Sequence, residues 1–352
     1  MATVDASDVR AGFELDAVRL EHYLAEHVPG FRGPLTVRQF RGGQSNPTYL
    51  LDTPQRRYVL RRKPPGPLPA SAHAVDREYR VMRALEAETS VPVPNMLTLC
   101  TDDGVIGSWF YVMGHIDGRV FWDTSFPEVP SAQRARYFDA MNGALASLHN
   151  IDPAAVGLSD FGKPGSYFAR QISRWSRQYT ADTDAGRVPD LERVIEWLSG
   201  HIPPGEEVRV VHGDYRCDNL IFHPTEARVL AVLDWELSTL GHPLADFGYH
   251  LMMYRMPTLA VSGLLGRDLH ALGIPSERDY VATYCDRTRR AGIEHLEFYV
   301  AFNQFRFAAI LHGIRGRVLR GNAVSERARE YARHVEAVAG YAWQTALQAG
   351  QA

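Results

Sequence analysis

The chain has 352 residues, of which 45% are hydrophobic and 22% are charged, and this composition excludes a disordered or fibrous class. Its length exceeds that at which a single hydrophobic core usually stops growing, so we expect two lobes or two domains. The formal net charge of −3 gives no whole-molecule attraction to nucleic acid or to an anionic membrane, and neither is expected as a partner.

Several features predict a cytoplasmic protein in a reducing compartment. The three cysteines lie far apart in the sequence and form no C-x-x-C pair, so neither a zinc site nor a disulfide framework is expected. The N-terminus lacks the basic region and the apolar run of a signal peptide. The most apolar long stretch, residues 296–314, contains too many polar side chains for a membrane span.

The first third of the chain predicts a β-rich lobe. Residues 16–27 have the helical spacing of apolar side chains, and a Pro-Gly pair at positions 29 and 30 ends that helix. Short β-prone runs separated by turns then predict an antiparallel meander over residues 35–40, 48–52 and 58–62. Residues 63–69 are rich in proline, which lacks the backbone donor, and therefore form a loop.

An amphipathic helix and two further strands complete this lobe. Apolar side chains within residues 75–88 recur at helical spacing with charges between them. Residues 96–100 and 109–113 predict strands on either side of an Asp-Asp-Gly turn, and residues 114–118 predict a loop.

From about residue 132 onward helical patterns dominate, interrupted by three short strands at residues 208–212, 220–222 and 229–233. We therefore predict an α+β protein. Its β-rich N-terminal lobe covers residues 1–113, a hinge covers residues 114–118, and a mainly helical C-terminal lobe with a small β insertion covers residues 119–352.

The segment that contains these three short strands carries the residues with the clearest chemistry. The strand over residues 208–211 leads into His-Gly-Asp-Tyr-Arg-Cys-Asp-Asn, and two more strands lead to Asp-Trp-Glu. A hairpin between them would bring Asn219 and Asp234 side by side, because residues that flank the ends of a hairpin are neighbours. Amide and carboxylate oxygens, with substrate phosphates, suit Mg²⁺. Asp214 is then left to orient an incoming hydroxyl group and accept its proton, as phosphoryl transfer requires.

The spacing of these residues matches a kinase pattern. H-x-D-x-x-x-x-N, followed about fifteen residues later by a second Asp at a strand end, is the pair of catalytic and metal-binding loops in kinases. On these motifs the chain resembles the aminoglycoside phosphotransferase and choline kinase superfamily. More narrowly, it resembles the phosphotransferase-like domains that are fused to acyl-CoA dehydrogenases in some animal proteins. The likeness runs through residues 41–46, 58–66, 73–79, 111–118, 212–236 and 243–248.

The resemblance implies a bilobal protein-kinase-like fold and transfer of a phosphoryl group from ATP, with Mg²⁺, to a hydroxyl group of a small molecule. It assigns Asp214 as the catalytic base, and Asn219 and Asp234 as metal ligands. Arg216 takes the place of a lysine that faces the transferred phosphate in many protein kinases, with an exposed surface arginine as the alternative. Nothing in the sequence suggests a flavin site, so dehydrogenase activity is not inferred.

Three neighbouring residues have supporting roles by the same resemblance. Glu236 corresponds to the second acidic residue of the D-x-E in choline kinases, and either contacts a second metal or a substrate cation or makes a structural hydrogen bond. Asp246 resembles the aspartate that holds the catalytic loop by its backbone. His212 is interpreted as a packed anchor of that loop, because the proton of the nucleophile already has an acceptor.

The nucleotide is expected to contact the N-terminal lobe. Gly42, Gly43, Ser45 and Asn46 lie between two predicted strands, where glycines let backbone N–H groups approach phosphate oxygens, and they resemble the nucleotide-positioning loop of the family. Residues 113–118 resemble the adenine-binding linker, in which the carbonyl of Gly114 and the N–H of Ile116 would contact the base.

One position departs from the kinase pattern. Where V-A-I-K would supply a phosphate-binding lysine, the chain has Arg61. An arginine can still bridge the phosphates and a helix glutamate. Glu78 is in the position expected of that glutamate. The alternative is that Glu78 is an exposed helix charge. Lys63 would share a strand face with Arg61 and could contact the phosphates in its place.

The sequence indicates least about the pocket that would bind the phosphate acceptor. Arg170, Arg174 and Arg177 share a helical face, which is either a grip for an anionic substrate or a solvated surface. Asn303 and Arg306 either face the cleft or are satisfied core polar residues. An aminoglycoside pocket would present many carboxylates to a polycation, whereas the C-terminal helices here are rich in arginine and aromatic residues. We therefore expect a neutral or anionic hydroxylated metabolite, such as a hydroxyacyl thioester.

Two other functions remain open. The arginine in place of lysine is compatible with a nucleotide-binding pseudokinase that regulates a partner, and the resemblance also includes kinases of the aminoglycoside and choline type. Transfer of AMP rather than phosphate is a third possibility. The sequence leaves the acceptor, the choice of ATP over GTP and the oligomeric state open.

Overall fold

The computed structural model of the protein describes residues 6–40, 46–64, 74–323 and 325–349. The chain divides into two compact units. Unit 1 contains Met1–Phe121, Ala154–Leu158 and Asp218–Ser238, and unit 2 contains Trp122–Pro153, Ser159–Cys217 and Thr239–Ala352. Each unit is therefore built from three separate stretches of sequence.

Unit 1 is organised around a six-stranded sheet with the strand order β1-β2-β3-β4-β6-β5. All neighbouring strands in it pair antiparallel. The strands are β1 (Ala6–Ser7), β2 (Thr36–Phe40), β3 (Thr48–Asp52), β4 (Arg57–Arg62), β5 (Met96–Cys100) and β6 (Phe110–Gly114). The predicted meander is confirmed as β2, β3 and β4.

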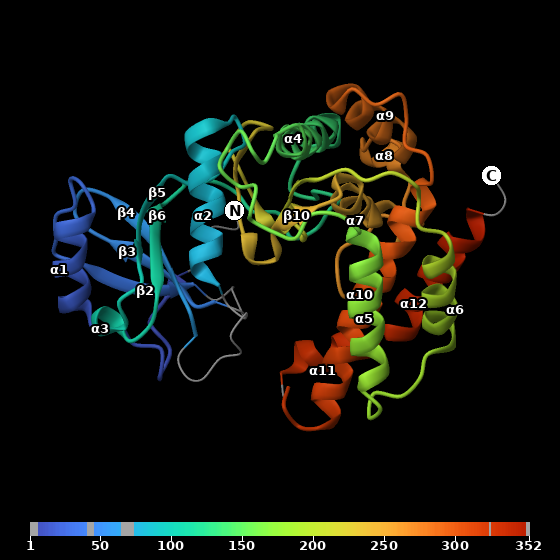
Figure 1. The fold of residues 1–352 in the computed structure, drawn as a ribbon. Coiled ribbons are helices and arrows are strands. Elements are labelled where there is room, and N and C mark those ends of the chain that lie inside the picture. Colours follow the sequence, from blue (N-terminus) through green and yellow to red (C-terminus); the bar gives the residue numbers. More distant parts are fainter. Residues whose placement is uncertain (1–5, 41–45, 65–73, 324, 350–352) are drawn as a thin grey trace. The chain divides into compact units, whose positions relative to one another are not determined.

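Helices cover both faces of this sheet. Figure 1 shows α1 (Ala17–His27) on one side and α2 (Val75–Glu88) on the other, with the short α3 (Asp103–Ile106) near one edge. Side chains alternate between the faces of a strand. Leu60 of β4 belongs to the core beneath α1, so its neighbour Arg61 points to the opposite face, toward α2.

A two-stranded hairpin completes unit 1. Strand β8 (Leu220–Phe222) pairs antiparallel with β9 (Val229–Val232), preceded by the 3-10 turn η1 (Cys217–Asn219) and followed by η2 (Trp235–Leu237). Its two strands are tied to the rest of the unit by the Val232 N–H, which donates to the carbonyl of Pro92 at 2.8 Å, and by a bridge between Phe222 and Arg119.

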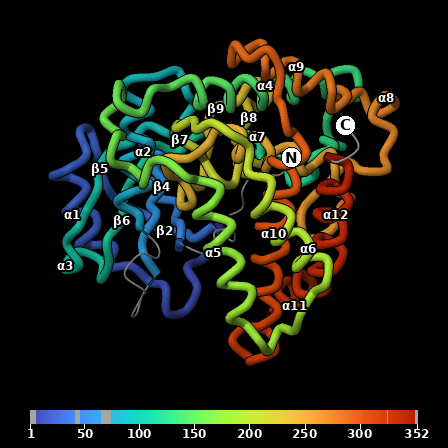
Figure 2. Tube along the Cα trace, turned by 45° about the vertical axis from the view of Figure 1, so that its right-hand side comes forward, coloured from blue at the N-terminus to red at the C-terminus, as the bar shows by residue number. Residues whose placement is uncertain are grey.

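Unit 2 is mainly helical and is arranged around α10. This helix lies among α5, α6 and α12 in Figure 2, and it also packs against α7 and α11. The unit contains α4 (Ser131–His149), α5 (Tyr167–Ala181), α6 (Pro189–Gly200), α7 (Pro243–Arg255), α8 (Leu269–Leu272), α9 (Glu277–Thr288), α10 (Leu296–Leu319), α11 (Glu326–Ala332) and α12 (Val335–Gln348). Among the described residues, every helix is too short or too polar to span a lipid bilayer.

The predicted strand after the helical region has a partner that the sequence did not reveal. Strand β7 (Arg209–Val211) pairs antiparallel with β10 (Thr239–Gly241). The three residues of β10 show no β pattern of their own, and their strand conformation comes from pairing. The predicted Asp-Asp-Gly turn is also more regular than expected, because the side chain of Asp102 accepts from the Gly104 N–H and caps α3.

Candidate active site

The segment that follows β7 in unit 2 is a loop held by its backbone. His212 is fully buried, and Gly213 has φ +85°, a conformation that favours glycine. The carboxylate of Asp246, in the first turn of α7, accepts hydrogen bonds from the N–H of His212 at 2.6 Å and from the N–H of Gly213 at 2.8 Å. His212 Nδ1 in turn accepts from the N–H of Asp214 at 3.2 Å. The anchoring roles predicted for Asp246 and His212 are confirmed.

A histidine that the sequence analysis did not single out supports Asp246. In His149, at the end of α4, Nε2 lies 3.2 Å from Asp246 Oδ2 and Nδ1 lies 2.7 Å from the Tyr284 hydroxyl. Burial acts to raise the pKa of Asp246, but the contact with His149 and the hydrogen bond from the His212 N–H outweigh it and hold that pKa below its ordinary value. Asp246 is therefore an anionic acceptor for the loop at neutral pH.

Within unit 2, the side chain of Asp214 contacts Tyr249 and Arg216. The hydroxyl group of Tyr249 in α7 donates a hydrogen bond to Asp214 Oδ1. Nε of Arg216 lies 3.0 Å from the same oxygen. The two residues predicted from the sequence as catalytic, Asp214 and Arg216, are thus in direct contact, whereas Tyr249 was not predicted.

The β8–β9 hairpin places the two predicted metal ligands at one end, in unit 1. Asn219 directly precedes β8 and its carbonyl accepts from the N–H of Leu233 at 2.8 Å, so it is a neighbour of the segment that contains Asp234, as expected. Asp234 has φ +65° and ψ +59°, a left-handed conformation that costs most side chains about 1–2 kcal/mol. Aspartate and asparagine are among the non-glycine residues that tolerate it best.

The donor set of this pair fits magnesium. Mg²⁺ is usually bound by one or two carboxylates and completes its shell with water and substrate phosphates. Asp234 supplies a carboxylate whose side chain is 34% exposed, and Asn219 supplies an amide oxygen. The described part of the chain contains no group of three or more His, Cys, Asp and Glu that could hold a metal ion.

Arg61 lies at the centre of an ion-pair network in unit 1. Its Nε is 3.0 Å from Glu78 Oε2, and its Nη2 is 2.6 Å from Asp234 Oδ1 and 3.5 Å from Glu236 Oε2. The side chain of Arg61 is only 10% exposed. The predicted pairing of Arg61 with Glu78 is confirmed, and the same guanidinium group also reaches the predicted metal ligand.

Glu78 is held by neutral donors as well as by Arg61. It accepts hydrogen bonds from Asn46 Nδ2 at 2.7 Å and from the Tyr111 hydroxyl at 3.1 Å, and its side chain is 1% exposed. Burial raises the pKa of Glu78 above its ordinary value, although Arg61 acts in the opposite direction. Burial acts to lower the pKa of Arg61, but Glu78 and Asp234 outweigh it and raise that pKa, so Arg61 remains a cation.

Lys63 has different neighbours from Arg61. Strand β4 ends at Arg62, and Lys63 Nζ lies 3.9 Å from the centre of the Trp109 ring. This cation–π contact gives the ammonium group a partner other than the carboxylates around Arg61. Of the two candidates, only Arg61 contacts Glu78 and Asp234.

The remaining predicted nucleotide contacts are backbone positions. Gly114 is the last residue of β6 and donates from its N–H to the carbonyl of Asn95 at 2.8 Å. Ile116 follows β6 outside regular structure and is partly buried. Three predicted positions of the glycine-rich loop, Gly42, Gly43 and Ser45, lie outside the described residues.

The polar residues of α10 prove to belong to the core. Asn303 Nδ2 donates to the carbonyl oxygens of Ala245 and Tyr299, at 2.7 and 2.8 Å. Arg306, which is 8% exposed, donates to the carbonyl of Gly213 at 2.8 Å. Both residues therefore hold the elements packed around α10 rather than line a cleft.

The arginines of α5 have contacts of their own. Arg170 donates to the carbonyl of Lys163 at 2.6 Å, and Arg177 donates to the Ser173 hydroxyl at 2.6 Å. Arg174 lies over the Trp175 ring, 5.4 Å from its centre. Each of these three guanidinium groups therefore has a partner within α5 or in the segment just before it.

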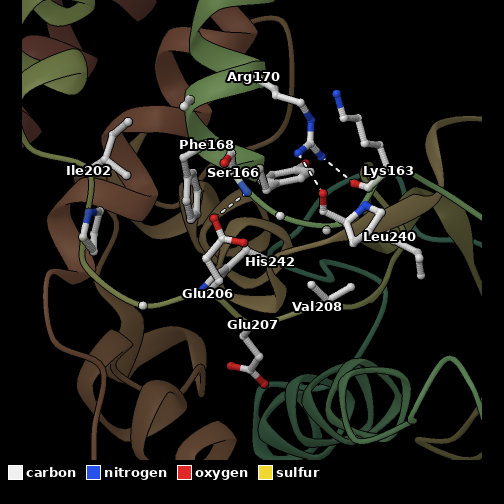
Figure 3. A pocket seen from close by; sticks show the side chains of 17 residues that line it. Lys163, Ser166, Phe168, Arg170, Ile202, Glu206, Glu207, Val208, Leu240 and His242 are labelled. Atoms are coloured by element: carbon white, nitrogen blue, oxygen red, sulfur yellow. Dashed lines mark hydrogen bonds between the residues drawn. The ribbon is translucent and has the colours of Figure 1, made fainter. Parts of the chain in front are cut away.

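A cavity of about 250 Å³ lies at the first turn of α5 within unit 2 (Figure 3). Glu206 accepts there from the N–H of Ser166, and burial lowers the pKa of His242 to about 4, so that its imidazole is neutral at physiological pH. Neither Asp214 nor Arg216 lines this cavity. It is therefore separate from the residues assigned to the chemistry.

A family model described as "Phosphotransferase enzyme family" matches residues 36–284. The chain belongs to this family. The match begins at β2 and ends in α9, so it includes every residue predicted from the sequence to act in phosphoryl transfer. The superfamily resemblance drawn from the motifs is thereby confirmed.

Relatives of this phosphotransferase-family chain include longer proteins. Over 320 residues it is 44% identical to acyl-CoA dehydrogenase family member 10 of Mus musculus, covering 90% of this chain and 30% of that protein. The chain spans less than half the length of the curated relatives it matches.

Solved structures of the family share the fold. A crystal structure from Ralstonia eutropha, named as a candidate aminoglycoside phosphotransferase, is 47% identical with a TM-score of 0.88, covering 95% of this chain and 99% of that one. A mutant of aminoglycoside phosphotransferase APH(4)-Ia, in a ternary complex with ADP and hygromycin B, is 14% identical with a TM-score of 0.61, covering 93% and 98%. The predicted α+β kinase-like fold is confirmed.

Proposed function

We propose that this chain transfers the γ-phosphoryl group of ATP to a hydroxyl group of a small molecule and requires Mg²⁺. The observation that supports this most is the set of contacts around the two aspartates. Asp214 sits on a loop anchored by Asp246, and Asp234 sits at the end of a hairpin beside Asn219, in contact with Arg61. Such fixed charges are what phosphoryl transfer needs, because its catalysis is mostly positioning and electrostatic stabilisation.

In the proposed step the acceptor oxygen forms a bond to the γ-phosphorus, and the bond from that phosphorus to the β–γ bridging oxygen breaks. Asp214 orients the hydroxyl group and accepts its proton, and ADP leaves with the electron pair. Arg216, 3.0 Å from Asp214, faces the transferred phosphoryl group. Asn219 and Asp234 would hold Mg²⁺, which would neutralise part of the phosphate charge when bound.

The nucleotide is assigned to the N-terminal lobe, residues 1–113. Arg61 contacts the phosphates and is oriented by Glu78, which Asn46 supports through a hydrogen bond of 2.7 Å. The glycine-rich loop, with Gly42, Gly43, Ser45 and Asn46, is proposed to contact the phosphates through its backbone N–H groups. In the hinge, residues 114–118, the carbonyl of Gly114 and the N–H of Ile116 contact the adenine base.

The acceptor belongs to the C-terminal lobe, residues 119–352, and is proposed to be a neutral or anionic metabolite that carries a hydroxyl group. A hydroxyacyl thioester is the specific candidate, because several curated relatives are named acyl-CoA dehydrogenases. The hygromycin B of the structural neighbour makes an aminoglycoside the alternative acceptor to include in any test.

A nucleotide-binding pseudokinase is the second candidate, and Arg61 is the observation that favours it. A guanidinium group that already contacts three carboxylates has less capacity left for phosphates than a lysine with one partner. Arginine can nevertheless bind a phosphate with two parallel hydrogen bonds, and Asp214, Asn219 and Asp234 are all present.

The test is ATP turnover in the presence of a library of hydroxylated metabolites, acyl thioesters and aminoglycosides, with and without Mg²⁺. We expect one acceptor class to stimulate ADP formation only when Mg²⁺ is present. Asp214→Ala should lower kcat by about 10²–10⁴-fold, the usual contribution of a general base. Thermal stabilisation by ATP, measured in parallel, reports nucleotide binding independently of turnover.

The outcomes separate the candidates. If ATP stabilises the protein but no compound is phosphorylated, or if Asp214→Ala turns ATP over like the parent, the kinase proposal is wrong and the pseudokinase is favoured. Release of pyrophosphate instead of ADP would indicate transfer of AMP.

A further inference from the structure

Helix α7 contacts the loop at residues 212–214 through two side chains that lie one turn apart. Asp246 binds the loop backbone, and Tyr249 donates to the Asp214 side chain. Residues three apart lie on the same face of a helix. One face of α7 therefore binds both the backbone of the loop and the side chain of Asp214.

We infer that Tyr249 is a positioning residue that fixes the orientation of the Asp214 carboxylate for proton transfer. The inference rests on the proposed function, in which Asp214 is the base. The last torsion of an aspartate side chain is soft, so a carboxylate without fixed donors samples a broad range of orientations. A donor that is itself immobile narrows that range.

The chemistry of Tyr249 suits this role. Burial, together with the Asp214 carboxylate, raises the pKa of the Tyr249 hydroxyl, so this group stays protonated and acts as the donor. A hydrogen bond to an ionised carboxylate is shorter and stronger than one between neutral groups. Arg216 contacts the same oxygen, but its side chain is 30% exposed, whereas Tyr249 is buried and is therefore held more firmly than Arg216.

Tyr249 is itself held by two helices. It is 7% exposed, and the guanidinium group of Arg306 in α10 lies 5.5 Å from the centre of its ring. Arg306 also donates to the Gly213 carbonyl, so the same side chain supports both the tyrosine and the loop. At Gly248 the helices α7 and α10 approach closely, since a Cβ there would lie 2.7 Å from the Tyr299 carbonyl oxygen.

Removal of the Tyr249 hydroxyl group should therefore affect the chemical step rather than the binding of ATP or the acceptor. We expect Tyr249→Phe to lower kcat by about 10–100-fold, the range in which misplacing a catalytic group by a fraction of an ångström acts. The KM values for ATP and for the acceptor should change by less than about twofold, since Tyr249 has no assigned contact with either. The substitution removes one oxygen and adds no volume, and a thermal melt verifies the fold.

Tyr254→Phe is the matched control. Tyr254 lies on the same helix and is buried, and its hydroxyl group has no hydrogen-bond partner among the described residues. Its removal should leave kcat within about twofold of the parent, because it has no contact with the loop.

A double-mutant cycle with Asp214→Ala identifies the route of the effect. If Tyr249 acts through Asp214, the double variant should turn ATP over at the rate of Asp214→Ala alone, because the group to be positioned is gone. Losses that multiply would assign Tyr249 a purely structural role, and so would a kcat for Tyr249→Phe equal to that of the parent. In either case the assignment of Asp214 as the catalytic base would be unaffected. If Asp214→Ala itself is as active as the parent, the proposed function fails before Tyr249 is tested.

Discussion

Replacing Arg61 by methionine should destabilise the protein strongly, and by an amount that depends on pH. Methionine keeps most of the buried apolar stem but removes the charge that faces Glu78 and Asp234 at 3.0 and 2.6 Å. Breaking a buried ion pair by removing one partner costs about 3–5 kcal/mol, because it leaves an uncompensated buried charge. Glu78 keeps its hydrogen bonds from Asn46 and Tyr111, so we expect the lower end, about 3 kcal/mol at pH 8.

The pH dependence follows from Glu78. Burial raises its pKa in the folded protein above the ordinary value. A raised pKa contributes stability that is fully present below the unfolded-state pKa and is lost as the pH rises through the folded-state value. Without Arg61, less opposes the effect of burial on the pKa of Glu78. Protonation of Glu78 at acid pH therefore removes more of the free-energy cost of the substitution. The loss should be smaller at pH 5 than at pH 8 by at least about 1 kcal/mol.

Urea unfolding followed by circular dichroism at both pH values measures this difference. Arg62→Met is the control, because Arg62 is also buried but donates to the backbone carbonyls of Lys63 and Ile106. It should cost about 1–2 kcal/mol with little change between pH 5 and pH 8. An equal loss for Arg61→Met at both pH values would refute the argument that a buried, unpaired Glu78 carries the cost.

Two further substitutions test the anchoring of the loop and the packing of α7. Asp246→Asn should lower the free energy of unfolding by about 2 kcal/mol at pH 7 and by less at pH 3, measured by urea titration, since it weakens the acceptor of two buried N–H groups. The pKa of Asp246 is held below its ordinary value, so its contribution is present above the unfolded-state pKa and is lost as the pH falls through the folded-state value. Gly248→Ala should lower stability by about 1–3 kcal/mol, because its Cβ would lie 2.7 Å from the Tyr299 carbonyl oxygen. Gly340→Ala, on α12 with 3.7 Å to the nearest atom, should instead raise stability by up to about 1 kcal/mol; equal melting temperatures for the two variants would contradict the packing argument.

Features that depend on local patterns were predictable from the sequence. The amphipathic spacing over residues 75–88 gave the bounds of α2, and turns between β-prone runs gave the meander. The neighbourhood of Asn219 and Asp234 could also be predicted, because a hairpin joins them by only two short strands. The pairing of Arg61 with Glu78 came from the position of both residues in a family pattern.

Residues whose role depends on distant contacts could not be found in this way. His149 and Asp246 are 97 residues apart, and no local pattern links them. Tyr249 lies on α7, which is buried from Pro243 to Tyr254. A helix buried on all sides has no apolar stripe, so its sequence does not indicate which side chain faces which neighbour. Strand β10 was missed for a related reason, since three residues carry too little pattern to predict pairing.

The interleaving of the two units has a consequence for synthesis on the ribosome. Unit 1 needs the stretch Asp218–Ser238, which supplies the β8–β9 hairpin and the Asp234 partner of Arg61. Its sheet can begin to form once about a third of the chain has emerged, but Arg61 lacks its Asp234 partner until the hairpin follows. Contacts that join distant stretches of sequence slow folding. During translation, unit 1 therefore cannot be completed before residue 238 is made.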